Sequence, residues 1–239
     1  MTTDSLARRS FFRRACCGSL GLAAAIAAPA LSAADAKKTS MTPDQALAAL
    51  KEGNAKFITD SPLSMVQGRA RRLEIARGQT PFAVLVSCSD SRVPPEVLFG
   101  RGLGELFIVR NAGNTVDTVA LGSIEYAVAV LGVPLIVVLG HERCGAVDAA
   151  LSVVENNTVF PGSLNQMIEP IVPAALMAKS KGMKGEELLD AAVRENVRRI
   201  VNRLRTSEPV LIDPMRAGKL RIVGARYDLD DGDVDFFIT

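Results

Sequence analysis

The chain has 239 residues, of which 48% are hydrophobic and 23% are charged, and its formal net charge is +2. This composition is close to that of an average soluble globular protein, so it excludes a disordered or fibrous chain, and the length suits one domain with a full core. Four arginines and two aspartates lie within residues 1–36, so residues 37–239 have no net charge. The charge balance therefore gives no reason to expect nucleic acid or an anionic membrane as a partner.

The first 36 residues have the pattern of an export signal. Arg8 and Arg9 are followed by Ser-Phe-Phe, and a short apolar run rich in Ala and Gly extends over 16–31. The run suits a signal better than a membrane span, and the paired arginines are typical of the twin-arginine route. We therefore expect residues 1–36 to be a cleaved twin-arginine signal and residues 37–239 to be one periplasmic or otherwise exported domain. The alternatives are an uncleaved N-terminal anchor and an accidental similarity to a signal.

Beyond this segment, the hydrophobic pattern predicts strands that alternate with helices. Thr42, Pro43 and Gln45 have the residue types of an N-cap, a first-turn proline and a capping box, and they open a helix predicted over 42–57. A basic stretch leads from there to Pro81. The elements expected next are strands at 82–86 and 105–111, a helix over 118–131, a strand at 134–140, a helix starting after it, a proline-interrupted stretch at 161–173, a helix over 185–207 and two closing strands around Asp231-Gly232.

The strands at 82–86 and 134–140 are continuous apolar runs, which indicate strands buried on both faces. Strands of this kind that alternate with helices predict an α/β fold with a mainly parallel central sheet flanked by helices. Ligands of such sheets bind at the carboxyl ends of the strands. The residues with the clearest chemical potential lie at two of these ends.

Three candidate metal ligands follow these strands. Cys88 comes after the first strand, and His141 and Cys144 come after the strand at 134–140. His141 is the only histidine of the chain, and two cysteines with one histidine and an open fourth position form a pattern of catalytic zinc sites. On spacing alone, two inert buried cysteines and a core histidine are the alternative.

Asp90 and Arg92 come two and four residues after Cys88. An extended backbone would place Asp90 on the same side as Cys88, where its carboxylate could accept a hydrogen bond from a metal-bound water and orient the hydroxide. Arg92 could hold that carboxylate in a bidentate ion pair and keep it ionised. A solvated surface ion pair is the alternative.

Five stretches together resemble the signature sequences of the β-class carbonic anhydrases. They are CSDSRVPPE, LFIVRNAGN, GSIEYAV, VVLGHERCGAV and the closing GARYDLDDGDVDFF, in the family's order and spacing from about residue 41 to the end. The resemblance implies the β-carbonic anhydrase fold. It also implies an enzyme, a zinc-dependent lyase that hydrates carbon dioxide reversibly to bicarbonate and a proton by zinc-hydroxide attack.

The resemblance assigns a role to each candidate residue. It implies that Cys88, His141 and Cys144 bind one zinc ion per subunit. Asp90 matches a residue with two states: paired with Arg92 it leaves the fourth zinc position to water, and turned inward it becomes the fourth ligand and closes the site. The positions that match the border and lining of the substrate pocket are Gln79, Phe107, Gly113 and Tyr126. Gln79 matches a residue often contributed across a dimer interface, and core packing alone is the alternative for Phe107 and Tyr126.

Three further expectations follow. The chain has no Trp, around which some bacterial members build a second bicarbonate site that locks the closed state, so we expect the constitutively open type. With His141 on zinc, no other histidine can shuttle protons, so hydration should depend strongly on external buffer. The family packs as dimers or multiples of dimers, so a homodimer or higher even oligomer is expected, with the helix at 42–57 as an arm.

Other functions would use the same residues. A carbon disulfide or carbonyl sulfide hydrolase has the same zinc hydroxide and differs in its access tunnels and assembly. A non-catalytic zinc-binding module would lack the orienting pair, whereas Asp90 and Arg92 are both present. A redox dithiol of Cys88 and Cys144 would lack the usual C-x-x-C motif.

Overall fold

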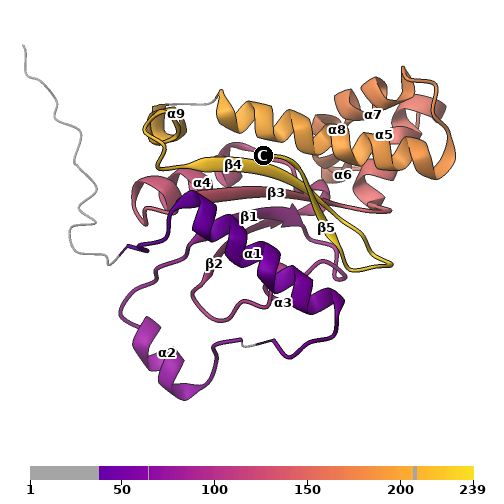
Figure 1. Cartoon of the computed structure of the whole chain (residues 1–239). Helices are drawn as coiled ribbons and strands as arrows, with labels where there is room; N and C mark the ends of the chain where they lie inside the picture. Colours follow the sequence, from indigo (N-terminus) through magenta and orange to yellow (C-terminus); the bar gives the residue numbers. More distant parts are fainter. Residues whose placement is uncertain (1–37, 64, 207–208) are drawn as a thin grey trace, which may run out of the picture. The chain divides into compact units, whose positions relative to one another are not determined.

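Figure 1 shows the computed structural model of the chain, which describes residues 38–63, 65–206 and 209–239. The predicted export signal at 1–36 lies outside the described residues. Among the helices that are described, none has the length and apolar character needed to span a bilayer.

One five-stranded sheet forms the centre, with the strand order β2-β1-β3-β4-β5. The pairs β1–β2, β1–β3 and β3–β4 are parallel, and β4–β5 is antiparallel. The strands are β1 (Ala83–Cys88), β2 (Leu106–Asn111), β3 (Leu135–His141), β4 (Arg221–Tyr227) and β5 (Val234–Ile238). The prediction of an α/β fold with a mainly parallel sheet is confirmed.

The middle and the edge of this sheet differ in burial. Every residue of β1 and β3 is buried, as their continuous apolar sequences predict. Every residue of β2 is only partly buried, and no strand pairs with its outer edge among the described residues. The edge at β2 therefore leaves one side of the sheet open for further packing.

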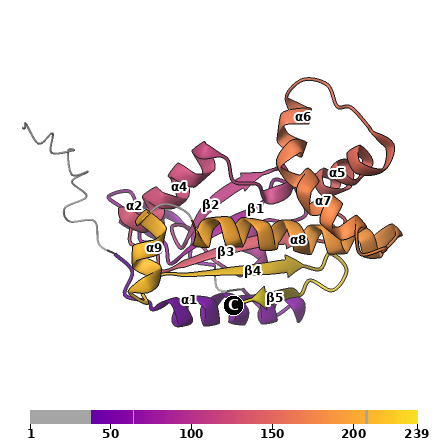
Figure 2. The same ribbon diagram turned by 90° about the horizontal axis from the view of Figure 1, so that it is seen from above.

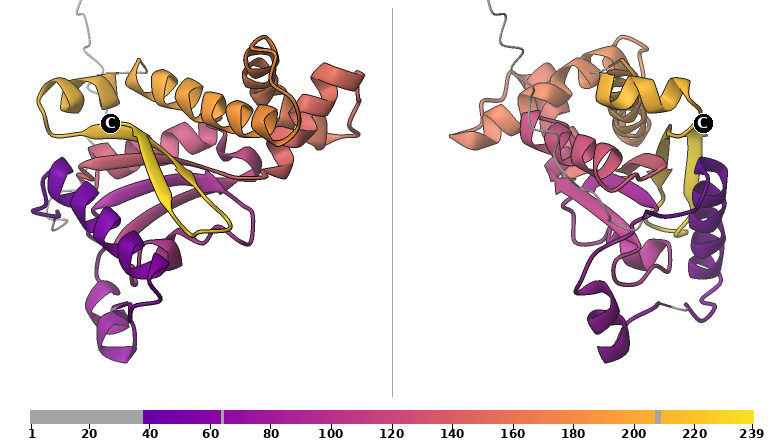
Figure 3. Two further views of the ribbon diagram at one scale, coloured as in Figure 1. Left: turned by 45° about the vertical axis from the view of Figure 1, so that its right-hand side comes forward. Right: turned by 90° about the vertical axis from the view of Figure 1, so that its left-hand side faces the viewer.

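Helices cover both faces of the sheet (Figures 1 and 3). Apolar side chains of α4, α8 and α9 pack against one face, and those of α1 and α3 pack against the other. The helices are α1 (Pro43–Ile58), α2 (Arg69–Ile75), α3 (Pro95–Leu98), α4 (Thr118–Ala129), α5 (Gly145–Asn156), α6 (Ser163–Ile168), α7 (Val172–Lys179), α8 (Gly185–Arg205) and α9 (Pro209–Arg216), with 3₁₀ turns η1 (Ala112–Asn114) and η2 (Glu169–Ile171). The result is a three-layer arrangement with the core on both sides of the sheet.

Helix α1 begins as its sequence predicts. The Thr42 hydroxyl accepts a hydrogen bond from the backbone N–H of Gln45, and the Gln45 side chain accepts one from the backbone N–H of Thr42. This capping box satisfies two backbone donors that the first helical turn leaves without partners.

Some helices were not predicted. The stretch at 161–173 contains α6, η2 and the start of α7, because Pro170 and Pro173 occupy first-turn positions, where a helix needs no N–H from them. Helix α2 buries none of its residues, so no apolar periodicity marks it. Helix α9 contains Pro214 in its interior, a residue type that argues against a helix there.

A third apolar cluster lies beyond the carboxyl ends of β1 and β3. Helices α5 and α7 and the first half of α8 contribute to it (Figure 2). The chain leaves β1 towards β2 on one side and later returns past β1 to β3 on the other. The boundary between β1 and β3 is therefore a switch point in strand order, where α/β sheets commonly bind ligands.

Candidate metal centre

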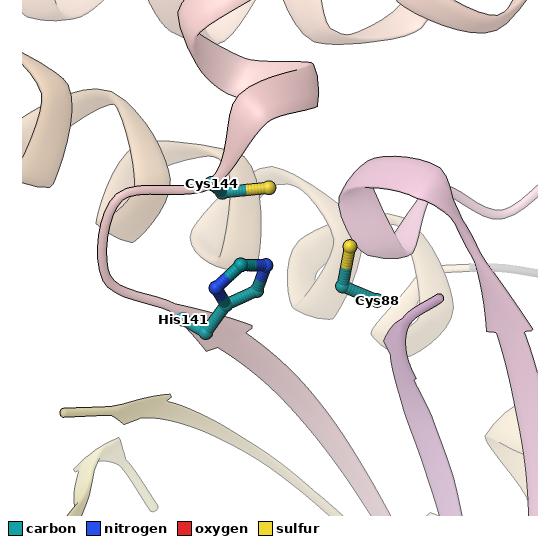
Figure 4. Close-up of side chains that lie close together, drawn as sticks. All are labelled: Cys88, His141 and Cys144. Carbon is teal, nitrogen blue, oxygen red and sulfur yellow. The ribbon is translucent and has the colours of Figure 1, made fainter. Parts of the chain in front are cut away.

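Three side chains converge at this switch point (Figure 4). Cys88 is the last residue of β1, His141 is the last residue of β3, and Cys144 is the N-cap residue of α5. One ligand atom from each lies within 4.8 Å of the others, and all three residues are buried. Since β1 and β3 are neighbours in the sheet, the fold itself brings together residues that are far apart in sequence.

The donor atoms of this group fit a zinc ion. The Nδ1 atom of His141 lies 2.9 Å from the carbonyl oxygen of Glu142, which leaves Nε2 as the free ring nitrogen. Nε2 is buried and has no hydrogen-bond partner among the described residues, which is rare for a buried polar atom and leaves it available to a metal. Two sulfurs and one imidazole nitrogen are donors that zinc prefers.

Cys88 and Cys144 shift each other's pKa in opposite directions. The hydrogen bond from Cys144 is the main cause that lowers the pKa of Cys88, and the backbone N–H of Gly113, 3.3 Å from the Cys88 sulfur, lowers it further. The same bond, together with burial, raises the pKa of Cys144. Cys88 is therefore the easier of the two cysteines to deprotonate, and binding of a metal requires that both lose their protons.

Asp90 lies beside the free ring nitrogen of His141, with its Oδ2 atom 3.9 Å from Nε2. Arg92 holds the carboxylate through Nε, 3.0 Å from Oδ1, and through Nη2, 2.8 Å from Oδ2, and the backbone N–H of Arg92 also donates to Oδ1. These bonds, first of all those from the Arg92 side chain, hold the pKa of Asp90 well below its usual range. The carboxylate is therefore ionised and fixed at the edge of the ligand group.

The backbone that joins Cys88 to Asp90 is fixed by an arginine that the sequence analysis did not single out. Arg110, on β2, donates hydrogen bonds to the carbonyl oxygens of Cys88, at 2.8 Å, and Asp90, at 2.7 Å. Cys88 and Asp90 are thus held at one spacing by a side chain from the neighbouring strand.

The loop between His141 and Cys144 is fastened to the end of β4. Arg143 has a positive φ of 48° and pairs with Asp230 through both terminal nitrogens, at 2.9 and 2.7 Å. Arg226, on β4, lies 3.3 Å from the Glu142 carboxylate. Glu142, Asp228 and Asp230 also form a cluster of acidic groups, and each of them already pairs with Arg143 or Arg226.

The residues that the resemblance assigns to the substrate pocket lie in different surroundings. Phe107, on β2, and Tyr126, on α4, are partners, with ring centroids 6.4 Å apart. Gly113 is buried in η1, beside the Cys88 sulfur. Gln79 is exposed in the loop before β1, and nothing among the described residues hydrogen-bonds to its side chain. The fold therefore brings Gly113 to the ligand group but does not bring Gln79 to it within this subunit.

The family model described as carbonic anhydrase matches residues 83–234 of this chain. A carbonic anhydrase of Mycolicibacterium smegmatis is 42% identical over 193 residues, which are 81% of this chain and 92% of the relative. Carbonic anhydrase 2 of Mycobacterium tuberculosis is also 42% identical, over 190 residues, which are 80% of this chain and 90% of the relative. The matched regions contain the three candidate ligands.

Solved structures give the same result. One of two tetrameric β-carbonic anhydrases from the ascomycete Sordaria macrospora superposes with a TM-score of 0.64 at 27% identity, over 69% of this chain and 84% of the other. The β-carbonic anhydrase of Coccomyxa in complex with acetazolamide has a TM-score of 0.64 at 31% identity, over 70% of this chain and 76% of the other.

Proposed function

Because this chain belongs to the β-class carbonic anhydrases, we propose that it catalyses the reversible hydration of carbon dioxide to bicarbonate and a proton. One zinc ion per subunit is held by Cys88, His141 and Cys144. The observation that carries the proposal is the position of Asp90: its ionised carboxylate lies 3.9 Å from the free nitrogen of His141, at the edge of a ligand group that fits zinc.

The chemistry divides between the metal and Asp90. When bound, zinc supplies a Lewis acid that brings the pKa of a water molecule towards about 7. Asp90, which Arg92 keeps ionised, can only accept a hydrogen bond, so it orients any proton donor beside the ligand group. Arg92 acts through Asp90, because both of its side-chain hydrogen bonds go to that carboxylate.

Carbon dioxide is linear and apolar, so it needs an apolar wall rather than hydrogen-bond donors. Phe107, the second residue of β2, and Tyr126, on α4, have ring centroids 6.4 Å apart, and Phe107 is partly buried against the core. Phe107 pairs with Val84 near the start of β1, so these rings lie away from Cys88 within one subunit. We assign these rings to the wall of the carbon dioxide pocket of a partner subunit, since Tyr126 is exposed in the single chain. Gln79 reaches the pocket in this proposal only from a partner subunit.

The arrangement of Asp90 supports the open type of site. Its carboxylate is held by three hydrogen bonds from Arg92 in the bidentate pairing that leaves the fourth metal position to water. We propose that this pairing is the resting state near neutral pH and that no locking site involving Trp opposes it, since the chain has no Trp.

The deciding experiment is stopped-flow hydration of carbon dioxide followed with a pH indicator, at pH 7 and 8.5, on full chain with measured zinc. We expect Asp90→Asn to lower the rate by about 100-fold or more, in the range of general acid–base effects. Asp213→Asn is the matched control, because Asp213 is an exposed aspartate on α9, and it should retain the parent rate.

The other results have definite meanings. Activity of the parent at pH 8.5 but not at pH 7 would show a closed site with Asp90 on the metal. No hydration at either pH, with zinc fully bound, would overturn the proposal, and assays with carbon disulfide and carbonyl sulfide would then separate a sulfur-analogue hydrolase from a non-catalytic zinc-binding module.

We also propose that residues 1–36 are a twin-arginine signal and that residues 37–239 act as one domain in the periplasm. The support is the Arg8-Arg9 pair before a short apolar run over 16–31. Replacing both arginines with lysine should keep the protein in the cytoplasmic fraction, and the N-terminal sequence of the exported parent should begin near residue 37. An uncleaved parent N-terminus would instead indicate an anchor.

For the assembly, we propose a homodimer or a higher even oligomer. The support is the tetrameric Sordaria relative, the partly exposed edge strand β2, and two exposed apolar residues of α4, Val119 and Tyr126. Light scattering should give an even number of subunits, and Val119→Asp should reduce it, because Val119 is 77% exposed in the single chain. A monomeric parent would contradict this proposal and would remove Gln79 from the site.

A further inference from the structure

Asn196 is a buried amide on a helix face that is otherwise apolar. Helix α8 buries Val193, Val197 and Ile200 in the core, and Asn196 lies among them with only 2% of its surface exposed. Burying an amide costs free energy unless its polar atoms are hydrogen-bonded. An apolar residue would pack here without that cost, so the amide has to be explained by the bond that it makes.

That bond leads to the metal centre. The Nδ2 atom of Asn196 donates to the carbonyl oxygen of Gly113 at 2.9 Å, and the backbone N–H of Gly113 donates to the sulfur of Cys88 at 3.3 Å. Gly113 is therefore bonded through its oxygen to α8 and through its nitrogen to a metal-ligand sulfur.

Because Gly113 is a glycine, its backbone needs a hydrogen bond from outside its own loop to hold one conformation. Its φ of 78° lies in the left-handed region, and an added Cβ would lie 2.5 Å from Cδ1 of Ile171 and 3.1 Å from Cβ of Ala146, so a glycine is required. Glycine has the widest choice of backbone conformations. A hydrogen bond to its carbonyl oxygen holds the following peptide unit in place, which restricts φ and ψ of Gly113 and so narrows the directions that its N–H can take.

We propose that Asn196 is a positioning residue for Cys88. By holding Gly113, it directs the Gly113 N–H at the Cys88 sulfur, and it thereby sets the charge that the thiolate gives to the metal and the rate at which the metal leaves. Hydrogen bonds to ligand sulfurs and other outer partners are known to tune metal sites in this way. The inference rests on the proposed zinc centre and concerns the metal rather than the substrate.

The chain contains a matched control for this residue. Asn54, on α1, is 3% exposed, and its Nδ2 donates to the carbonyl oxygen of Gly232 at 2.9 Å. Gly232 also has a φ of 78°, but it lies in the β4–β5 turn, which contains none of the three zinc ligands Cys88, His141 and Cys144. Asn54→Leu therefore removes the same kind of bond from the same kind of glycine as Asn196→Leu. It also removes the Asn54 bonds to the carbonyl oxygen of Leu98 and from the N–H of Val234, so it is a stringent control for a general loss of stability.

The experiment measures the metal directly, on the full chain. Zinc-loaded protein is mixed with excess chromogenic chelator to give the release rate, and cobalt-loaded protein gives the thiolate-to-cobalt charge-transfer absorption. We expect Asn196→Leu to release zinc about 10- to 100-fold faster than the parent and to displace the absorption band. Asn54→Leu should lower the melting temperature but keep the parent's release rate and band.

The inference is overturned if Asn196→Leu keeps both the release rate and the band of the parent, or if Asn54→Leu changes them equally. Asn196→Ser is a milder variant in case the leucine variant does not fold. Its hydroxyl can bond a carbonyl of its own helix but is too short to reach Gly113, so it should change both readouts in the same direction. A parent without a thiolate-to-cobalt band would overturn the metal centre together with this inference, whereas a parent with the band and Asn196 variants equal to it would overturn this inference alone.

Discussion

At the scale of single residues, the Asp228 carboxylate is connected by hydrogen bonds and ion pairs to the loop between His141 and Cys144. Its Oδ1 atom accepts hydrogen bonds from the backbone N–H groups of Asp230 and Asp231, and its Oδ2 atom lies 2.7 Å from Arg226. The Arg226 side chain is the first cause that lowers the pKa of Asp228. Through these bonds, Asp228 shapes the turn from which Asp230 reaches Arg143.

This lowered pKa predicts a pH dependence of stability. A carboxylate whose pKa is lower in the folded chain stabilises the fold above its unfolded pKa of about 3.9, and this contribution is lost as the pH falls through the folded value. Asp228→Asn should therefore be less stable than the parent at pH 6, and the difference should shrink as the pH falls below about 4. Denaturant titrations between pH 2 and 6 measure it. A gap of constant size in Asp228→Asn would contradict the expectation.

The sequence predicted the residues that touch the ligand group better than the residues that support it. Cys88, His141, Cys144 and Asp90 were found because their chemistry is distinctive and because strand ends of a parallel sheet converge. Arg110 was missed, because nothing in sequence shows that an arginine on β2 turns to the backbone of the next strand. Asn196 could have been found from the sequence, because it is an amide at a position where the apolar periodicity of the predicted helix places a buried residue.

At the scale of secondary-structure elements, β4 carries two arginines in very different surroundings. Arg226 is 12% exposed and pairs with Glu142, Asp190 and Asp228. Arg221 is 36% exposed and pairs with Asp44, which is itself 82% exposed. The first arginine joins β4 to α8 and to the metal-ligand loop, whereas the second makes a surface contact with α1.

The two arginines should therefore respond differently to alanine. Arg226→Ala removes the arginine partner of Asp228, whereas Glu142 keeps Arg143 and Asp190 keeps Arg194. Because Asp228 is partly buried, we expect the substitution to lower the free energy of unfolding by about 2 kcal/mol. Arg221→Ala loses a surface pair and should stay within about 0.5 kcal/mol of the parent. Denaturant unfolding at pH 7 compares the two, and equal effects would show that the network at Arg226 adds no stability.

The elements that the sequence predicted are those whose burial is periodic or continuous. Strands β1 and β3 are predicted by their continuous apolar sequences, because they are buried on both faces. Helix α1 is predicted by the residue types of its capping box, Thr42 and Gln45. Helix α2 has no buried residue, so no apolar pattern exists from which it could be read. Prolines within 161–173 predict an interruption, but Pro170 and Pro173 occupy the first turns of η2 and α7, where a proline can start a helix.

At the scale of the whole molecule, the chain has one histidine, and it lies in the ligand group. No second imidazole can carry protons from the site to the solvent near neutral pH. We therefore expect the maximal hydration rate to rise steeply with the concentration of an imidazole-type buffer at constant pH and ionic strength. Stopped-flow measurements from a few millimolar buffer upwards test this, and equal rates in weak and strong buffer would contradict it.

The ligand group also joins three parts of the fold, since its residues come from the ends of β1 and β3 and from the start of α5. A metal that binds the folded chain and not the unfolded chain stabilises the fold by mass action. Removing zinc with a chelator should therefore lower the melting temperature of the parent by several degrees, as measured by calorimetry. Cys144→Ser should melt lower than the zinc-loaded parent and respond little to the chelator, and an unchanged parent would contradict the assignment of the site.

The order of these parts along the chain has a consequence for synthesis. All three ligands and Asp90 lie between residues 88 and 144, whereas Asn196 and Arg226, which hold the surrounding backbone, come later. A ribosome adds about 5–20 residues per second, so for several seconds a growing chain displays the cysteines and the histidine without α8 and β4 behind them. The metal centre is therefore finished only when the last third of the protein has been made.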